Sequence, residues 1–239
     1  MNNLKSFREA IYASANHLNA DQMRLFEPFV CHGNPYDAEI FFVGTNGVLD
    51  DASRPMLAFD KYWSDEHGFD FVAWHRDLGR LPGGYSKTRT MADYAIAVLK
   101  KHGLDKKVLS TNVYCTGSPS LAKLHRDLRV VAPFEFLLQE LRPKVLFVFG
   151  TPAKTVLMTR WSEQIAIQKS AVPDVEIFTL LLNGRTVKGI FTKHLSMHVG
   201  YADVAAYAEL LAKLYQNDEN VASFANEKPI SEAQGKMQS

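Results

Sequence analysis

Three polar side chains stand at or near the ends of apolar segments, where they have no evident packing role. Asn46 lies in the turn "GTNG" after one segment, Asn112 lies toward the end of a second, and His194 follows a third. A side-chain amide presents a hydrogen-bond donor and an acceptor side by side, and an imidazole donates, accepts and titrates near neutral pH. Two carboxylates, Asp50 and Asp51, follow Asn46 closely. Brought together, such groups could bind a polar ligand and position a water.

The segments that must position these groups alternate between strand and helix patterns. The apolar runs 38–44, 107–115 and 144–150 have the length and the β-branched or aromatic content of buried strands. Asn183-Gly184 is typical of a hairpin turn, and Thr151 is a candidate helix N-cap. Helices are predicted at 88–103, 130–143, 151–161 and 202–215, and two further strands at 176–184 and 186–194.

This alternation predicts an α/β fold, namely a three-layer α/β/α domain with a mainly parallel central sheet. Ligands of such folds bind outside the carboxyl ends of the strands. Asn46, Asn112 and His194 are therefore expected to converge on one rim. The domain is expected to span residues 1–216, and the polar, non-periodic stretch 217–239 is predicted to be a disordered tail.

Composition restricts the class of protein. The chain has 239 residues, 46% of them hydrophobic, which is enough to bury one full core. It shows no signal-peptide pattern and no apolar run long enough to span a bilayer, so a soluble, cytoplasmic protein is expected. The net charge of +1 neither demands nor excludes nucleic acid as a partner. Two cysteines, Cys31 and Cys115, are too few for a disulfide framework or a cysteine-only metal site.

Several motifs, in the right order, resemble those of the uracil-DNA glycosylase superfamily. "VGTNG" is similar to its first motif, "STNVYCTGSPS" to the Thr-Asn-Val-Val-Lys-Cys segment of its iron-sulfur family, and "KHLSMHVG" to its His-Pro-Ser motif. "LRPKVLFVFGTPA" resembles the intervening segment, and "DDASRPMLAF" resembles the acidic, then Arg-Pro-Phe, run after the first motif. The agreement extends over roughly residues 38–215, so the resemblance implies a uracil-DNA glycosylase-like fold for most of the chain.

The resemblance also implies an activity, that of a monofunctional DNA glycosylase acting without a metal on a pyrimidine flipped out of DNA. By position, Asn46 would orient the attacking water, and Asp50 or Asp51 would polarise it if Asn46 only holds it. His194 would donate a hydrogen bond to the pyrimidine O2, and Asn112 would read the base edge.

Further contacts with the substrate follow from the same resemblance. An aromatic residue, Phe59 by position or else Tyr62, would stack on the flipped base. The other implied contacts are Gly44, Thr45 and Gly47 with the base, and Ser118, Ser120, Ser196 and His198 with the DNA backbone.

Departures from the family pattern bear on the substrate. Gly47 and Leu195 stand where proline is usual, so both loops are free to follow a different path. The tyrosine that excludes a C5 substituent in the most uracil-selective branch is absent, and Gly47 and Val48 stand in its neighbourhood. A pyrimidine with a bulky C5 group could therefore enter. Cys31 and Cys115 cannot supply the four cysteines of an iron-sulfur cluster, so no cluster and no cofactor are expected.

Substrate and role stay open at the level of sequence. Uracil is the default base and implies DNA repair, whereas a hydroxymethylated or glucosylated cytosine of phage DNA would imply antiviral defence. A module that binds DNA or a partner without catalysis is the alternative from another class, because a Gly-X-Asn-Gly turn is also an ordinary turn. An enzyme of free nucleotides is a third reading, which no glycine-rich phosphate loop supports. DNA is the expected partner and a monomer the expected state.

Overall fold

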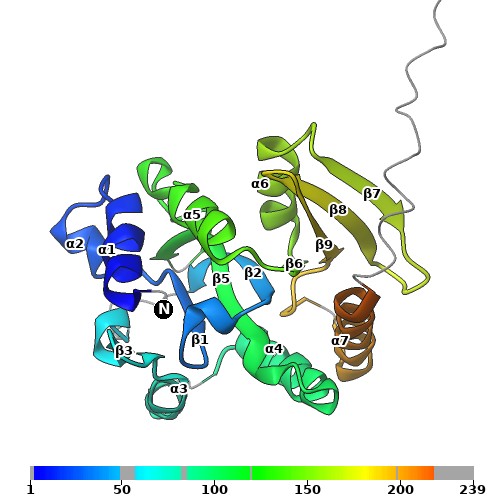
Figure 1. Ribbon diagram of the computed structural model, residues 1–239, viewed down its shortest axis with the longest axis horizontal. Helices are drawn as coiled ribbons and strands as arrows, with labels where there is room; N and C mark the ends of the chain where they lie inside the picture. Colours follow the sequence, from blue (N-terminus) through cyan, green and yellow to red (C-terminus); the bar gives the residue numbers. More distant parts are fainter. Residues whose placement is uncertain (1–2, 49–56, 82–84, 119, 198, 218–239) are drawn as a thin grey trace, which may run out of the picture.

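A seven-stranded sheet forms the centre of the molecule. The computed structural model describes residues 3–48, 57–81, 85–118, 120–197 and 199–217. The strands lie in the order β1-β5-β2-β6-β9-β8-β7 (Figure 1). Their bounds are β1 Phe29–Cys31, β2 Ile40–Val48, β5 Val108–Ser118, β6 Val145–Phe149, β7 Ile165–Lys169, β8 Glu176–Leu182 and β9 Arg185–Thr192.

The centre of this sheet is parallel and its edges are antiparallel. β5, β2, β6 and β9 pair in parallel, so their carboxyl ends meet at one edge of the sheet. β1 pairs antiparallel with β5 at one side, and β8 and β7 extend the sheet antiparallel beyond β9. Asn183 and Gly184, with φ of 48° and 76°, form the predicted turn between β8 and β9. The five predicted strands are thus confirmed, whereas β1 and β7 were not predicted.

Seven α-helices, several short 3-10 turns and a small ribbon are described besides the sheet. The helices are α1 Leu4–Ser14, α2 Ala20–Met23, α3 Phe71–Gly79, α4 Lys87–Leu99, α5 Ala132–Leu141, α6 Thr151–Arg160 and α7 Tyr201–Gln216. The ribbon pairs β3 Trp63–Ser64 with β4 Gly68–Phe69. None of the helices in the described ranges is long and apolar enough to cross a membrane.

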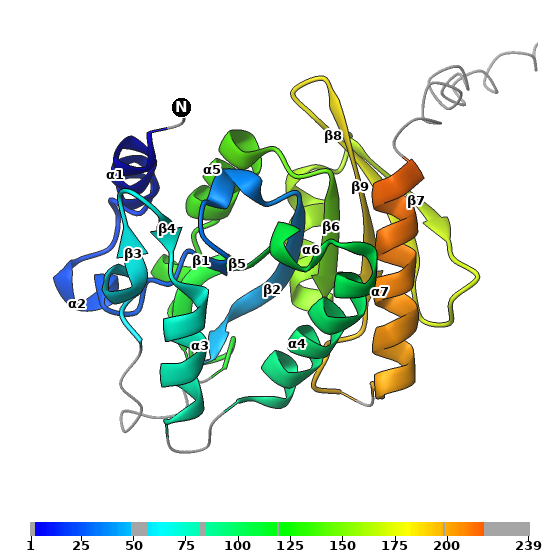
Figure 2. The ribbon, with the colours of Figure 1, turned by 60° about the horizontal axis from the view of Figure 1, so that its bottom comes forward.

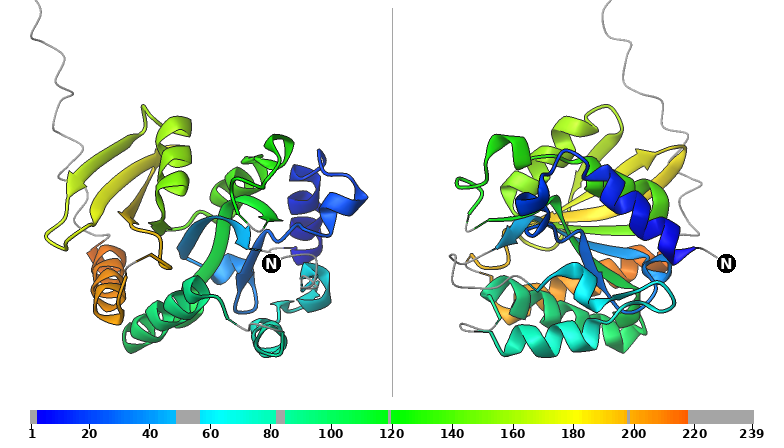
Figure 3. Two further views of the ribbon diagram at one scale, coloured as in Figure 1. Left: turned by 180° about the vertical axis from the view of Figure 1, so that it is seen from behind. Right: turned by 90° about the vertical axis from the view of Figure 1, so that its left-hand side faces the viewer.

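Helices cover both faces of the sheet, which gives the three predicted layers (Figures 2 and 3). Phe41 and Val43 of β2 belong to the core that includes residues of α1, α5 and α6. Ile40 and Phe42 of the same strand belong to the core formed with α4 and α7. Because alternate side chains are buried on opposite faces, the strand reads as a continuous apolar run. The α/β class and the mainly parallel centre of the sheet are therefore confirmed.

The predicted helix ends agree with the structure except at one cap. α4 continues through a 3-10 turn to Gly103, which adopts the expected left-handed conformation at φ 70°. α6 begins at Thr151 itself, so the predicted threonine N-cap is wrong and Gly150 takes the cap position. α7 ends at Gln216. The predicted tail lies outside the described residues from 218 onward.

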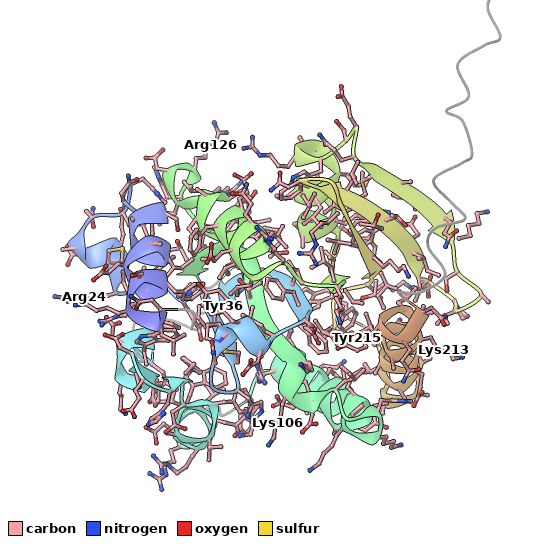
Figure 4. The ribbon with its side chains drawn as sticks, viewed as in Figure 1. Arg24, Tyr36, Lys106, Arg126, Lys213 and Tyr215 are labelled. Atoms are coloured by element: carbon pink, nitrogen blue, oxygen red, sulfur yellow. The ribbon has the colours of Figure 1, made fainter. Side chains whose placement is uncertain are left out.

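An aromatic cluster attaches the N-terminal segments to the sheet. Phe7 of α1 stacks on Trp63 at 6.1 Å and meets Phe29 of β1 edge-on at 5.9 Å between ring centroids. Tyr36, which Figure 4 shows near α1, donates from its hydroxyl to Glu140 of α5 at 2.6 Å. The cluster holds β1 in place beside β5, where β1 forms one side of the cavity described below.

Gly189 of β9 allows the sheet to pack closely and provides a test of this packing. A Cβ atom there would lie 2.3 Å from Cζ of Phe178 and 2.6 Å from the carbonyl oxygen of Leu146. We expect Gly189→Ala to lower the free energy of unfolding by about 1–3 kcal/mol in urea denaturation, because buried Phe178 must shift.

Gly79→Ala is the matched control for this substitution. Its Cβ would meet only the far end of the Tyr85 side chain, at 3.1 Å, and alanine suits a helix better than glycine. We expect the stability of this variant to be unchanged or slightly higher. Equal losses in both variants would contradict the proposed role of Gly189.

Candidate functional site

A cavity of about 210 Å³ brings together the three polar residues singled out from the sequence. Asn46, Asn112 and His194 all line it, and they come from β2, β5 and the segment after β9. Residues of α3 and α4 complete the wall, and Figure 2 shows the end of β2 lying between these two helices. The predicted convergence at the carboxyl ends of the parallel strands is therefore confirmed.

Asn46 is held at the end of β2 by a side chain of β5. Its amide nitrogen donates to Oγ of Ser118 at 2.9 Å, and that hydroxyl in turn donates to the carbonyl oxygen of Ser120 at 2.7 Å. The register of β2 against β5 shifts between Asn46 and Val48, which is where this bond forms. The bond fixes which way the amide of Asn46 faces.

Asn112 lies across a glycine of the neighbouring strand. It pairs with Gly44 of β2, and a Cβ at Gly44 would lie 2.5 Å from Oδ1 of Asn112 and 3.2 Å from the Phe149 ring. Any side chain at position 44 would therefore displace the amide. Gly44 thus provides the space that the amide of Asn112 occupies beside the cavity.

His194 is fixed in one orientation by its own loop. Nδ1 accepts the backbone N–H of Ser196 at 3.3 Å, with Oγ of Ser196 at 2.7 Å, and the ring lies edge-on to Phe149 at 6.0 Å between centroids. Because a backbone N–H can only donate, the proton of the neutral ring resides on Nε2. Burial lowers the pKa of His194, so the ring is neutral at pH 7. Nε2 is then an uncharged hydrogen-bond donor.

The ring of His194 also explains the conformation of Gly150 at the start of α6. A Cβ at Gly150 would lie 3.0 Å from Cδ2 of His194, and the backbone there has φ 94°. Both facts favour glycine, since few other residues adopt this conformation. The segment after β6 and the loop after β9 are therefore in direct contact beside the cavity.

Glu27 lines the same cavity, although the sequence analysis did not identify it. Its backbone N–H donates to the carbonyl oxygen of Cys115 at 2.9 Å, which places it beside β5 just before β1 begins. Within the described part of the chain, no hydrogen bond or ion pair reaches its partly buried carboxyl group. Burial raises the pKa of Glu27 to about 7, and the positive charge of Arg89 offsets this only in part.

Arg89 is a further charged residue of the cavity that was not predicted from the sequence. Its guanidinium group lies over the rings of Trp74 at 5.2 Å and Phe71 at 5.4 Å, and it forms an ion pair with Asp93. Its Nε is buried and has no hydrogen-bond partner among the residues that the structure describes. Arg89 lies in the first turn of α4, where a positive charge is unfavourable because it opposes the helix dipole. This unfavourable position is a feature of the sequence that could have indicated a functional role for Arg89.

Two predicted base contacts are wrong. Phe59 is only 3% exposed and packs on Trp63 at 5.5 Å and Phe69 at 5.4 Å, so its ring belongs to the aromatic cluster and not to the cavity. Tyr62 is also buried, and its hydroxyl donates to Asp77 at 2.9 Å. Burial of these two rings in the core removes their apolar surface from water. The aromatic rings that line the described cavity are those of Trp74 and Phe149.

The residues predicted to contact the DNA backbone differ in exposure and in their position relative to the cavity. Ser118 is buried and its hydroxyl holds Asn46, so the predicted contact of Ser118 with DNA is wrong. Ser120 is exposed, and Ser196 lies beside His194. Thr45 lines the cavity with Gly44. Asp50, Asp51 and His198 lie outside the described residues, and Gly47 is described only as part of β2.

The thiols of Cys31 and Cys115 are both buried. Burial raises the pKa of Cys115 to about 12 and raises the pKa of Cys31 further still, so both remain protonated at neutral pH. In the described ranges, no three histidine, cysteine, aspartate or glutamate side chains lie close enough to hold a metal ion.

Comparison with known proteins assigns no family to the chain. No protein-family model matches the sequence, and no curated protein matches it. The chemistry of the cavity therefore has to be argued from the residues that line it.

The buried carboxyl group of Glu27 makes stability depend on pH in a predictable direction. Because its pKa is raised in the folded protein, folding favours the protonated form, and stability falls as pH rises between about 4.5 and 7. Replacing the carboxyl by an amide in Glu27→Gln removes this loss. We expect the variant to gain up to about 3 kcal/mol relative to the parent protein at pH 8, and little at pH 4.

Urea denaturation at the two pH values measures this effect. Glu163→Gln, which removes an exposed carboxylate in the turn after α6, serves as the control and should change stability equally at both. A Glu27→Gln variant whose stability relative to the parent protein is the same at pH 4 and pH 8 would show that Glu27 is not protonated preferentially in the fold.

Proposed function

We propose that this protein is a monofunctional DNA glycosylase that hydrolyses the N-glycosidic bond of a pyrimidine flipped out of DNA and leaves an abasic site. The observation that carries the proposal is the meeting of Asn46, Asn112 and His194 in one cavity. Cleavage of an N-glycosidic bond builds positive charge on the sugar and negative charge on the departing base. The site must stabilise the charge on the base and deliver a water to the sugar.

His194 supports the first requirement. Its neutral ring carries the proton on Nε2, which allows it to donate a hydrogen bond to the pyrimidine O2 as that oxygen gains negative charge. A neutral donor releases no proton to the base in the ground state and strengthens its bond as charge develops. The fixed loop geometry around Ser196 means that this donor need not reorganise during the reaction.

Asn46 and Asn112 support the second requirement and the recognition of the base. Asn46, held by Ser118, would orient the attacking water through its carbonyl oxygen, and Asp50 or Asp51 remains the proposed group that polarises this water. An amide alone is too weak a base for that step. Asn112 would read the base edge, because its donor and acceptor groups stand side by side across Gly44.

The size of the cavity favours a single base over a larger ligand. Its volume of about 210 Å³ is below the range of about 300–1,000 Å³ that holds drug-sized ligands. A whole nucleotide with its phosphates would have to extend outside, whereas one pyrimidine ring would fit. This observation favours a flipped base in DNA over a free nucleotide. DNA is accordingly the proposed partner, and a cytoplasmic monomer the proposed state.

Substitution of the two reacting-centre residues tests the proposed activity. We expect Asn46→Ala and His194→Ala each to slow excision by about 10²–10³-fold, because each removes a group aimed at the reacting atoms. Formation of abasic sites is measured on oligonucleotides containing uracil and on phage DNA containing hydroxymethylated or glucosylated cytosine. The first substrate tests a repair role and the second a defence role.

Asn16→Ala and His17→Ala are matched controls, because both residues are exposed in the turn after α1 and do not line the cavity. We expect their excision rates to equal that of the parent protein, and all four variants to keep their melting temperatures within a few degrees. Parent protein that binds DNA but forms abasic sites in neither substrate would favour a non-catalytic DNA-binding module.

A further inference from the structure

The carboxyl group of Glu27 has no role in the hydrolysis proposed above, yet it faces the same cavity. Charged side chains are rarely buried without a partner, because transfer from water is unfavourable unless hydrogen bonds replace the lost hydration. The side chain is partly buried, and no group in the described part of the chain bonds to it. A ligand that brings a hydrogen-bond donor to this place would satisfy the carboxylate.

The order of strands places Glu27 and His194 at opposite ends of the cavity. Glu27 bonds to β5 through Cys115, Asn112 lies on β5, Asn46 lies on the neighbouring β2, and His194 lies against Gly150 at the end of β6. Glu27 lies one strand spacing beyond β5, so three spacings, about 14 Å, separate its backbone from β6. With the side chains of Glu27 and His194 lining the cavity from its two ends, this span holds one pyrimidine with a hydrogen bond of about 3 Å at each end of its Watson–Crick edge.

A pyrimidine that meets His194 with its O2 presents N3 and the C4 substituent along the same Watson–Crick edge, toward Asn112 and Glu27. The group at C4 distinguishes the two kinds of base on this edge, since cytosine carries an amine there and uracil an oxygen. A carboxylate accepts hydrogen bonds and cannot donate one, so it binds the amine of cytosine and repels the oxygen of uracil. The charge of Glu27 is thus a means of discriminating between these bases.

The positive charge of Arg89 favours the ionised form of Glu27, although Arg89 forms no ion pair with it among the described residues. Its guanidinium group is bonded to Asp93 and lies over Trp74 and Phe71, and the described residues show no ion pair between Arg89 and Glu27. Its positive charge nevertheless lowers the pKa of Glu27 against the effect of burial. The carboxylate therefore keeps its acceptor capacity for a ligand.

We propose that Glu27 is a specificity-determining residue that accepts a hydrogen bond from an exocyclic amine at C4, so that the excised base is of the cytosine type. This inference rests on the proposed glycosylase activity and names the substrate class of the same site. A 5-substituted cytosine satisfies it, and the sequence has Gly47 and Val48 in the neighbourhood where the most uracil-selective branch of the similar superfamily has the tyrosine that excludes a C5 group. Uracil would leave the carboxylate unpaired and bring a second acceptor against it.

Single-turnover excision from oligonucleotides that differ in one base measures this selection. Uracil, cytosine and 5-hydroxymethylcytosine are placed at the same position, and each rate is determined at pH 8 for the parent protein and for Glu27→Gln. We expect the parent protein to excise at least one of the cytosine-type bases at least tenfold faster than uracil. Glu27→Gln should reduce this preference about ten- to hundredfold, because a glutamine amide can also donate to the uracil oxygen.

Three further measurements make the result decisive. Glu163→Gln is the matched control and should keep the parent preference. Glu27→Asp keeps the charge and shortens the side chain, so it should slow excision and retain the preference for an amine. Between pH 6 and pH 8 the preference of the parent protein should rise as Glu27 ionises, and that of Glu27→Gln should not. Taking the ratio of two bases cancels the titration of His194, which serves both. The thiol of Cys115, which interacts electrostatically with Glu27, keeps its proton over this range because burial raises its pKa.

The outcomes separate the inference from the activity on which it rests. Excision of uracil faster than both cytosine-type bases by the parent protein would overturn the inference and leave the glycosylase activity intact. A preference that Glu27→Gln leaves unchanged would do the same. No excision of any of the three bases would overturn the proposed activity, and the inference with it.

Discussion

The cavity depends on the parallel pairing of β2 with both β5 and β6. Parallel strands end at the same edge of a sheet, so Asn46, Asn112 and the segment that holds His194 meet there, although they are far apart in the chain. An antiparallel partner at any of these three positions would send one of the groups to the opposite edge. The helices on both faces are the condition for this arrangement, because parallel strands of this kind are buried on both sides. The core on each face therefore supports the geometry of the cavity.

Close approach between backbone and side chain is the second constraint on the cavity. Gly44 leaves room for the amide of Asn112, and Gly150 leaves room for the ring of His194. At both places the side chain that faces the cavity lies over a glycine of a neighbouring segment. The glycines set the position of the polar groups as much as the strands do. This explains why glycine follows the apolar runs of both β2 and β6, where a turn alone would accept other residues.

Five of the strands and the main polar residues could be predicted because they depend on local patterns. Apolar runs, cap residues and the Asn183-Gly184 turn are each decided within a few residues, and the carboxyl-end rule then places Asn46, Asn112 and His194 together. Glu27 could not be found in this way, because it reaches the cavity through a three-residue antiparallel strand that pairs with β5 over a long sequence distance.

The errors have the same physical origin. Phe59 was assigned to the base by its distance from the first motif, but the core competes for large aromatic side chains and the aromatic cluster buries it. The resemblance implies a contact of Ser118 with the DNA backbone, but β5 continues to this residue and its hydroxyl holds Asn46. In both cases tertiary packing decided between two uses of the same side chain, and a motif contains no information about packing.

The polar groups of the cavity oppose the stability of the fold that contains them. Among the residues that the structure describes, the carboxyl group of Glu27 and the buried Nε of Arg89 have no hydrogen-bonding partner, and unpaired polar atoms of this kind are unfavourable for folding. The aromatic rings around Arg89 and the apolar cores on both sides of the sheet offset this effect. An apolar residue in place of Glu27 would remove the unfavourable burial of a carboxyl group and, with it, one group that a ligand could bind. Recognition and instability thus arise from the same unsatisfied groups, since a ligand gains most where the empty cavity leaves a hydrogen bond unmade.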